Sequence, residues 1–227
     1  MDFEQGVLLL IDKPLRWTSF DVVKKVKGIS RAKKVGHAGT LDPLATGLLI
    51  LCTGKMTRKI DDYQAQEKEY TGSFTLGVTT PCYDREQPED ATFPTAHITS
   101  EAIYAAAKVF TGTIQQTPPP HSAIKIGGKK AYELARKGKE VIMKQREVSI
   151  TVFEITDIQM PVVSFKVVCS KGTYIRSLAH DFGKYLQSGA CLQSLCRTRI
   201  GSFMLADALS LEDFSASVKE LNTNASD

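Results

Sequence analysis

The sequence predicts an α+β fold, in which strands and helices are mixed along the chain without a strict strand–helix–strand alternation. Two kinds of segment carry this prediction: apolar runs of strand length, such as residues 48–51, and runs with apolar residues at helical spacing, such as residues 22–29. The chain has 227 residues, a hydrophobic content of 42% and a charged content of 24%, which suits a globular protein with one large core. No internal repeat and no break in composition marks an interior domain boundary.

The first part of the chain is expected to begin with a strand and a capped helix, because Ser19 precedes the apolar positions Val22, Val23, Val26 and Ile29. Residues 80–98 are rich in proline, threonine and acids, so we expect a surface loop there. The elements expected before that loop are, in order, a strand at 7–11, a helix from 19 to 29, a strand at 48–52, a short polar helix at 55–62 and a strand at 70–76 that Gly77 ends.

The second part of the chain is expected to continue the same mixture. Three consecutive prolines at 118–120 preclude regular structure at that point. The elements expected around them are a helix at 101–110 ended by Gly112, a helix at 129–137, strands at 148–158 and 162–169 that turn near Pro161, a helix that begins just after Gly172, a strand at 192–203 and an end helix at 211–221.

Composition excludes several classes of protein. No apolar stretch approaches the roughly 18–20 residues that span a bilayer. The acidic N-terminus MDFEQG lacks the basic region of a signal peptide, so we expect a cytoplasmic protein. The five cysteines form no CxxC pair and lie near no histidine cluster, which favours free thiols and predicts no metal site.

The positive charge is unevenly distributed, although the net charge is only +4. Residues 22–34 contain six basic residues and no acid, and residues 125–146 contain eight basic residues against two glutamates. Residues 205–227 instead carry five acids and a single lysine. Either basic cluster alone is typical of a solvated surface, but two together favour a partner that is a polyanion such as a nucleic acid.

The most informative stretch is GHAGTLDPLATGLL at 36–49, which places one carboxylate, that of Asp42, in a glycine-rich loop. Pro43 biases Asp42 toward an extended backbone, and the apolar run that follows predicts a buried strand that anchors the loop. A carboxylate held in this way suits a nucleophile or a general base. The residues alone favour an ordinary Asx turn between two strands, because Asp-Pro and glycine are common in turns.

The segment at 36–49 resembles the catalytic loop of the TruB family of tRNA pseudouridine synthases, and further segments resemble that family in the same order. Together they cover nearly the whole chain to about residue 205, which makes the resemblance far more specific than any single motif. The other segments are LLLIDKPLRWTSFDVVKKVKG at 8–28, EKEYTGSFTLG at 67–77, TPPPHSAIKIGGKKAYELARKGKEV at 117–141, SKGTYIRSLAHDFG at 170–183 and SLCRTRIGSF at 194–203.

The resemblance implies a mostly antiparallel central sheet flanked by helices and loops, with an RNA-binding cleft across it. It implies a catalytic domain over residues 1–205, which includes a basic RNA-contacting segment at about 117–146, and a short acidic tail at 206–227 in place of a separate RNA-binding domain. The implied activity is isomerisation of uridine 55 in the T-loop of tRNA, with no cofactor and no metal. The implied partner is the T-arm of tRNA, and we expect a monomer with no obligate protein partner and no membrane association.

The resemblance also assigns roles to individual residues. Asp42 matches the nucleophile, Arg176 matches the cationic partner of that carboxylate, and Tyr70 matches the tyrosine that stacks on the target base. His37 matches the residue that fills the space left by the flipped nucleotide. Three further positions match substrate-binding residues: Tyr174 and Leu195 in the base pocket, and Lys13 in the first motif.

The chain departs from the family pattern in two places. Arg16 stands where the first motif usually has a glycine, which leaves the form of that turn open. The residues after the last strand are few, acidic and serine-rich, so we expect affinity for RNA to come from the catalytic domain itself.

Several alternatives stay open at the level of the sequence. An RNA chaperone could use the same basic and aromatic surfaces without chemistry, and a hydrolase could use Asp42 to release free uracil. An RNA-guided synthase is a further alternative, although the chain lacks the segments that such enzymes use to join partner proteins. Whether Asp42 would attack the base or the sugar is also undecided.

Overall fold

The strands at the start of the chain pair around β3 (Ala45–Thr53), which contains the apolar strand that the sequence predicts at 48–52. The computed structural model describes residues 2–122, 125–126, 129–130 and 143–224. These residues form two compact units: unit 1 comprises Met1–Tyr70 and Leu195–Asp227, and unit 2 comprises Thr71–Ser194. Each unit is described by itself, and β4 (Lys68–Leu76) and β12 (Ala190–Ile200) each have residues in both.

Unit 1 contains a mixed sheet built on β3 (Ala45–Thr53). Strand β1 (Leu8–Lys13) pairs antiparallel with β3, as does the short β2 (Val35–His37), while β12 pairs with β3 in parallel through Leu195 and Ala45. Strand β13 (Phe203–Met204) adds an antiparallel pairing to β12. The sheet is therefore mixed, with antiparallel pairs in the majority among those described.

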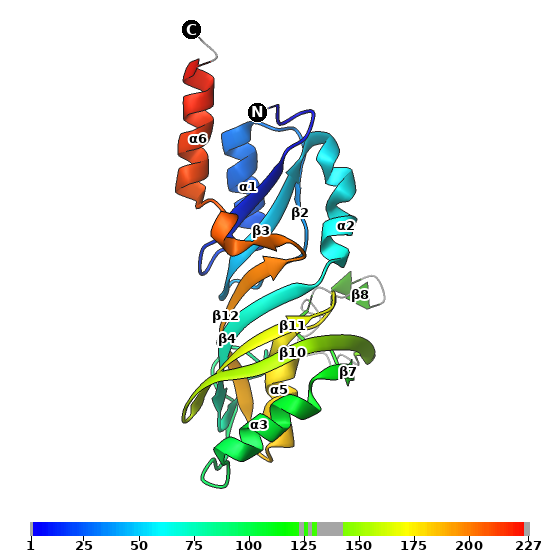
Figure 1. Ribbon diagram of the computed structural model, residues 1–227, viewed down its shortest axis with the longest axis vertical. Helices are drawn as coiled ribbons and strands as arrows, with labels where there is room; N and C mark the ends of the chain where they lie inside the picture. Colours follow the sequence, from blue (N-terminus) through cyan, green and yellow to red (C-terminus); the bar gives the residue numbers. More distant parts are fainter. Residues whose placement is uncertain (1, 123–124, 127–128, 131–142, 225–227) are drawn as a thin grey trace. The chain divides into compact units, whose positions relative to one another are not determined.

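The side chains of β1 and β3 alternate between two faces, and each face is covered by helices. On one face Leu9, Ile11, Leu49 and Leu51 pack against helices α1 (Ser19–Ser30) and α6 (Leu211–Asn224). On the other face Leu48 and Ile50 pack with Ile200, and partly buried residues of α2 (Ile60–Ala65) cover them. Figure 1 shows α1 and α6 side by side along this part of the chain. The alternation explains why the run at 48–51 is apolar without interruption: both of its faces are buried.

The N-cap of helix α1 lies one residue earlier than the sequence predicts. The N-cap is Thr18, whose hydroxyl accepts a hydrogen bond from the Asp21 backbone N–H at 3.0 Å, while the Asp21 carboxylate accepts one from the Thr18 N–H at 3.0 Å. This reciprocal capping box satisfies two backbone donors that would otherwise lack partners. The prediction that Ser19 is the cap was wrong, because Ser19 is instead buried against the loop at Leu41.

Unit 2 contains an antiparallel sheet. Strand β10 (Arg146–Gln159) pairs with β11 (Val162–Cys169) on one side and with β7 (Gly112–Gln116) on the other, and β4 lies beside β11. Helices α3 (Ser100–Val109) and α5 (Ile175–Tyr185) pack against each other, and α3 also contacts β10. The core includes a group of phenylalanine rings in edge-on, tilted and stacked contacts from β4, β10, β11 and α5, namely Phe74, Phe153, Phe165 and Phe182.

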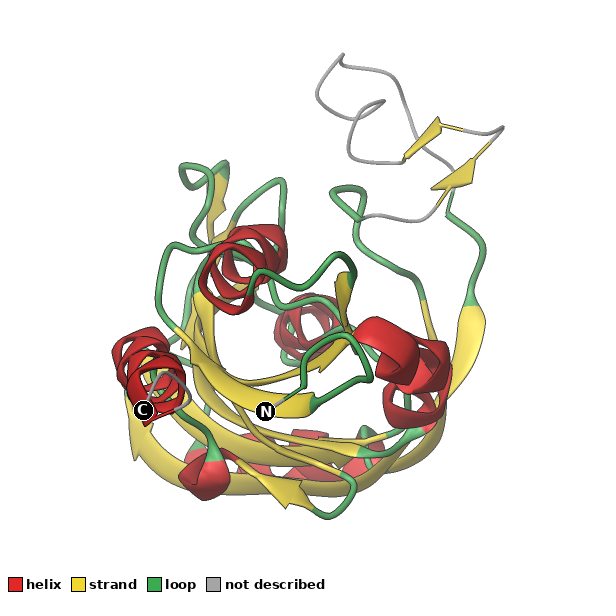
Figure 2. Cartoon of the chain, turned by 90° about the horizontal axis from the view of Figure 1, so that it is seen from above, coloured by secondary structure: helices red, strands yellow, loops and turns green. Residues whose placement is uncertain are grey.

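The predicted α+β class is confirmed, and helices flank the strands in both views (Figures 1 and 2). The elements near 55–62 and 80–98 are more divided than predicted. A 3₁₀ turn (Gly54–Lys59) precedes α2, and β5 (Val78–Thr79), just before the predicted loop, pairs with β6 (Ala91–Thr92) inside it. A second 3₁₀ turn (Leu205–Asp207) precedes α6.

The helix predicted at 129–137 is wrong at its start. Lys129–Lys130 form strand β9, which pairs with β8 (Lys125–Ile126), and residues 131–137 lie outside the described residues. The segment contains alanine, leucine and lysine, which have high helix propensity, so its composition favoured a helix. A β-strand depends instead on pairing with a neighbouring strand, which composition does not show. None of the helices within the described part of the chain is long and apolar enough to cross a membrane.

Candidate functional site

Asp42 lies in unit 1, in the connection between β2 and β3. The residue is half-buried, and its backbone C=O accepts a hydrogen bond from the Ala45 N–H at 3.0 Å. The neighbouring Leu41 is buried. Ser19 anchors Leu41, because its hydroxyl accepts from the Leu41 N–H at 2.9 Å and lies 3.2 Å from the Leu41 carbonyl oxygen. The connection is therefore held on both sides of Asp42 by strands and by α1.

Lys13 at the end of β1 ties this connection to the turn before α1. Its ammonium is fully buried and donates to the carbonyl oxygens of Pro14 at 2.9 Å, Trp17 at 2.6 Å and Pro43 at 3.5 Å. Burial lowers the pKa of Lys13 from 10.5 to about 8, and the nearby negative charge of Asp42 opposes that shift. Lys13 is thus a buried cation whose hydrogen bonds reach the residue directly after Asp42.

Arg197 of β12 braces the same connection from inside unit 1. The side chain is 1% exposed, its Nε donates to the Leu48 carbonyl oxygen at 2.8 Å, and its Nη2 donates to the Gly39 carbonyl oxygen at 3.2 Å. A buried guanidinium that bonds two carbonyls fixes the backbone on both sides of Asp42. Sequence reasoning assigned Arg197 no role. The available signal was that the motif at 194–203 places two arginines, Arg197 and Arg199, in an expected strand.

Gly47 allows β3 and β12 to approach closely at this point. Its φ is +97°, and a Cβ built there would lie 2.4 Å from the carbonyl oxygen of Arg197 and 2.8 Å from its N. Only a glycine fits, because both the backbone angle and the space exclude a side chain.

The remaining sequence-predicted residues of unit 1 lie on the same sheet. His37 ends β2, and its Nδ1 is buried without a hydrogen-bond partner among the described residues. Burial lowers the pKa of His37, so the neutral ring is favoured. Tyr70 is 9% exposed in β4, and the half-buried Leu195 pairs with Ala45 directly after the Asp42 connection.

Tyr174 belongs to unit 2, where it is the N-cap residue of α5. Gln116 of β7 fixes its backbone, because the amide oxygen accepts from the Tyr174 N–H at 2.8 Å and the amide nitrogen donates to the Tyr174 carbonyl oxygen at 3.1 Å. The guanidinium carbon of Arg146 lies 4.6 Å from the centre of the Tyr174 ring, and Arg146 also donates to the Gly172 carbonyl oxygen. The ring is therefore covered by a cation on one side.

Arg176, also in unit 2, is buried rather than exposed on its helix. Its guanidinium donates to the carbonyl oxygens of Cys82 at 3.2 Å and His121 at 3.1 Å, and its Nε lies 3.6 Å from a carboxylate oxygen of Asp84. Both side chains of this ion pair are about 5% exposed. Asp84 also accepts from the Glu86 N–H at 2.9 Å and lies 2.9 Å from the Cys82 Sγ.

Asp84 is a residue that sequence reasoning missed. It lies in the segment predicted as a surface loop, and nothing in that stretch of the sequence distinguishes it from the neighbouring acids. The structure shows it to be 3% exposed and paired with a charged residue far along the chain. Its importance follows from burial, because an unpaired charge inside a protein is costly.

The predicted site residues are thus divided between the two units. Lys13, His37, Asp42, Tyr70 and Leu195 belong to unit 1, whereas Tyr174 and Arg176 belong to unit 2. Much of the basic segment at 117–146 lies outside the described residues. Within the described ranges, no group of three or more histidine, cysteine, aspartate or glutamate residues is placed to hold a metal ion.

Comparison with known proteins gives matches along the whole chain. The family model of the TruB pseudouridylate synthase N-terminal domain matches residues 27–175, and that of the tRNA pseudouridylate synthase B C-terminal domain matches residues 176–227. The chain is 51% identical to tRNA pseudouridine synthase B of Flavobacterium johnsoniae over 225 residues, which cover 96% of this chain and 98% of that protein. It is 53% identical to the protein of the same name from Parabacteroides distasonis over 219 residues, with 94% and 93% covered.

Two solved structures are similar in fold. A Cbf5–Nop10–Gar1 complex aligns with a TM-score of 0.73 and 30% identity, and an H/ACA RNP bound to a substrate RNA containing 2'-deoxyuridine aligns with a TM-score of 0.74 and 26% identity. The alignments cover 94% and 98% of this chain but only 54% and 56% of the chains in those structures, so this chain spans a little more than half of their length. Because a family model matches more than half of the chain and relatives about 50% identical match nearly all of it, the chain belongs to the TruB family of pseudouridine synthases.

Proposed function

We propose that this chain isomerises uridine 55 in the T-loop of tRNA to pseudouridine, with Asp42 as the nucleophile. The reaction breaks the bond between the ribose C1' and N1 of uracil, turns the base and joins C1' to C5; C5 releases its proton to water, and N1 takes up a proton from water. Substrate and product have the same composition, so neither a redox cofactor nor a group donor is needed. Family membership over the whole chain, combined with the Asp42 connection, carries the proposal.

The surroundings of Asp42 support this role. A nucleophile must be held in one orientation, and Lys13, Ser19 and Arg197 all bond the backbone within a few residues of it. Asp42 itself is half-buried, whereas Leu41 and Ala45 on either side of it are buried. The backbone on both sides of Asp42 is thus fixed by buried side chains, as a positioned nucleophile requires.

The family's motifs support the roles of the other residues. We assign Arg176 as the partner that keeps the Asp42 carboxylate ionised, and Asp84 as the residue that holds Arg176 in place. Tyr70 would stack on the target base, Tyr174 and Leu195 would line the base pocket, and His37 would fill the space that the flipped nucleotide leaves. A neutral His37, which burial favours, suits stacking between bases. Lys13 would act on the substrate through the Asp42 connection.

We further propose that residues 1–205 act as the catalytic domain, with 206–227 as an acidic tail, and that the basic segment at 117–146 contacts RNA. The partner would be the T-arm of tRNA, bound by a monomer in the cytoplasm. Affinity for RNA would then depend on basic side chains within the catalytic domain.

The decisive experiment uses an unmodified tRNA transcript that carries tritium at C5 of its uridines. We expect release of one equivalent of tritium into water, mapped to position 55, with the purified chain and no added metal or cofactor. The variant Asp42→Asn should release none while it still binds tRNA, and Asp61→Asn, at an exposed position of α2, should behave as the unsubstituted chain.

The outcomes separate the alternatives. Free uracil among the products would indicate a hydrolase, and binding without release of tritium by the unsubstituted chain would indicate an RNA chaperone. Full activity of Asp42→Asn would show that another group is the nucleophile.

A further inference from the structure

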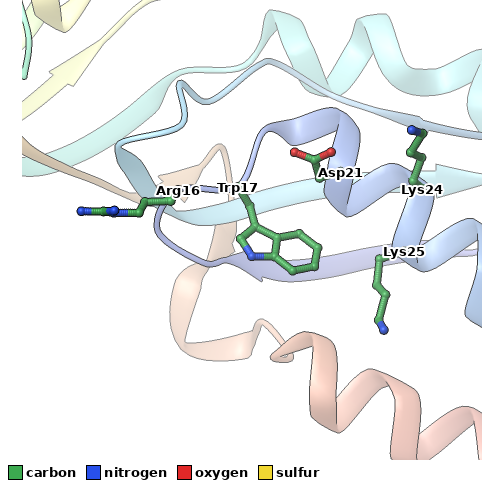
Figure 3. A pocket seen from close by; sticks show the side chains of 5 residues that line it. All are labelled: Arg16, Trp17, Asp21, Lys24 and Lys25. Carbon is green, nitrogen blue, oxygen red and sulfur yellow. The ribbon is translucent and has the colours of Figure 1, made fainter. Parts of the chain in front are cut away.

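A shallow basic pocket lies in unit 1 beside the Asp42 connection, and none of the roles assigned above uses it. Its volume is about 460 Å³, and its lining residues come from the turn before α1 and from α1 itself: Arg16, Trp17, Asp21, Lys24 and Lys25. Figure 3 shows the indole of Trp17 in the middle of this group, with Arg16 on one side and the two lysines on the other. We refer to these five residues as the basic pocket.

The charge of the basic pocket is available to a ligand. Arg16, Lys24 and Lys25 are all exposed, and no acid occurs between residues 22 and 34. The one acid in the lining, Asp21, is engaged by the backbone and hydroxyl of Thr18 in the capping box. Three cations therefore face solvent around a carboxylate that already accepts two hydrogen bonds.

Trp17 gives the basic pocket an anchored aromatic wall. The residue is half-buried and packs against the apolar core formed by β1, α1, β3 and α6, while the same side chain lines the pocket. Exposed cations around a partly buried aromatic ring are the combination by which proteins bind nucleic acid strands, since the cations contact phosphates and the ring stacks on a base or a ribose.

The backbone connects the basic pocket directly to the Asp42 connection. The Arg16 N–H donates to the Pro43 carbonyl oxygen at 2.7 Å, and the buried Lys13 bonds both the Trp17 and the Pro43 carbonyl oxygens. The turn that carries Arg16 and Trp17 is therefore bonded directly to the residue that follows Asp42.

Arg16 occupies a backbone conformation that does not suit it. Its φ is +67°, in the left-handed region that favours glycine, so the chain keeps an arginine at a position where a glycine would form the same turn with less strain. None of the described contacts shows the Arg16 side chain stabilising the fold in return for this strain. The side chain instead adds a cation to the pocket.

We propose that the basic pocket binds the phosphodiester backbone of the substrate RNA close to the target uridine, with Arg16, Lys24 and Lys25 contacting phosphates and Trp17 packing on a ribose or base. The proposal rests on the proposed function for the identity of the RNA, and it adds a contact surface to the catalytic loop. It predicts that these side chains contribute to binding rather than to the chemical step.

The test uses Trp17 itself, because it is the only tryptophan in the chain. The full chain is titrated with an unmodified tRNA transcript while tryptophan fluorescence is recorded, and saturation is checked by a filter-binding assay. We expect a saturable change in the fluorescence of Trp17. Arg16→Gly, Lys24→Ala and Lys25→Ala should each raise Kd by about five- to tenfold and reduce the slope of log Kd against log salt by about 1.

Arg16→Gly is the most informative of these variants, because it removes the charge and relieves the backbone angle together. Its thermal stability should be unchanged or higher while its affinity for RNA is lower, a combination that a merely structural role cannot produce. Lys219→Ala, an exposed lysine of α6 in the same unit, is the charge-matched control and should leave Kd unchanged. In the tritium assay the pocket variants should raise KM and leave kcat unchanged.

The results also distinguish this proposal from the proposed function. Two results would overturn RNA binding at the basic pocket and leave the proposed function standing. One is tritium release without any change in Trp17 fluorescence at saturating RNA, and the other is Kd values within twofold of the unsubstituted chain for all three variants. Charge-dependent quenching of Trp17 without tritium release would leave the pocket standing and overturn the function. If Lys219→Ala raised Kd as much as the pocket variants do, the effect would be one of net charge in general, and the proposal that the basic pocket binds RNA would be overturned.

Discussion

At the scale of single residues, the ion pair of Arg176 with Asp84 can be tested for two separate effects, one on the stability of the fold and one on the rate of the proposed reaction. Replacing Asp84 by Asn leaves a buried guanidinium without its countercharge, so we expect the free energy of unfolding to fall by about 3 kcal/mol. If Arg176 acts on the reaction as proposed, kcat should fall in the same variant at a temperature where it is still folded, with little change in KM. Urea denaturation and the tritium assay measure the two effects.

The matched control for Asp84→Asn is Glu154→Gln, at an exposed position of β10 in the same unit. It should change neither the free energy of unfolding nor kcat. An Asp84→Asn variant with full stability and full kcat would show that Arg176 does not depend on this carboxylate.

Lys13 provides a prediction about pH. Its pKa is about 8 in the folded chain and 10.5 when unfolded, so between these values the unfolded chain binds more protons than the folded chain. The free energy of unfolding of the native chain should therefore rise with pH over this window relative to that of Lys13→Met, by about 1 to 3 kcal/mol in total. Denaturation curves at several values between pH 7.5 and 10.5 measure the difference.

Only the pH-dependent part of that difference is diagnostic, because Lys13→Met also removes the hydrogen bonds to Trp17 and Pro43. Lys219→Met, at an exposed position, should show a curve parallel to the native one. Parallel curves for Lys13→Met as well would mean that the lysine has its ordinary pKa in the folded chain.

At the scale of the elements, two adjacent hydroxyl residues at the start of α1 have different functions. Thr18 caps the helix, so Thr18→Ala should lower the free energy of unfolding by about 1 kcal/mol without changing kcat. Ser19 bonds Leu41, so Ser19→Ala should cost a similar amount and also lower kcat, because the connection that carries Asp42 is loosened. Denaturation and steady-state kinetics on the two variants test this, and equal kcat values would show that the Ser19 contact does not position Asp42.

The parallel contact of β3 with β12 predicts a large effect of one methyl group. Gly47→Ala should lower the free energy of unfolding by more than about 2 kcal/mol, because its Cβ would overlap the backbone of Arg197 at a positive φ. Gly28→Ala in α1 is the control: a Cβ there meets nothing within 4 Å, so stability should rise by about 1 kcal/mol. A tolerated Gly47→Ala would mean that the two strands can move apart at this point.

The sequence predicts these elements well where local pattern decides them. The run at 48–51 and the helical spacing of Val22, Val23 and Val26 both reflect burial, which periodicity records directly. The choice between Thr18 and Ser19 as the cap was beyond the sequence, because both hydroxyls can cap and only the contact of Ser19 with Leu41, 22 residues away, decides between them. The hairpin at Lys129–Lys130 was missed for the same reason, since strand pairing is not local.

At the scale of the whole molecule, the resemblance to the family singles out the connection at 36–49 as the proposed catalytic loop, because it stands in order among the other motifs, which a single Asp-Pro pair could not do. The residues that stabilise this connection were less visible. Arg197 and Asp84 are charged residues whose importance comes from complete burial, and sequence alone gives every charged residue an exposed position as its default. Their partners lie in other segments, so only the tertiary structure brings them out.

The distribution of charge over the chain leads to a prediction about salt. Basic residues at 22–34 and acidic ones at 205–227 give a small net charge, so affinity for RNA should depend on local clusters rather than on the total. If the basic pocket supplies three phosphate contacts, Kd for tRNA should rise by roughly 40-fold between 50 and 200 mM salt through these contacts alone. The triple variant Arg16→Gly, Lys24→Ala, Lys25→Ala should lose that part of the dependence, whereas Lys219→Ala should keep it, and filter binding over the salt range measures both. An affinity for tRNA that does not change with salt would show that phosphate contacts contribute little, and recognition would then depend on the bases and the shape of the loop.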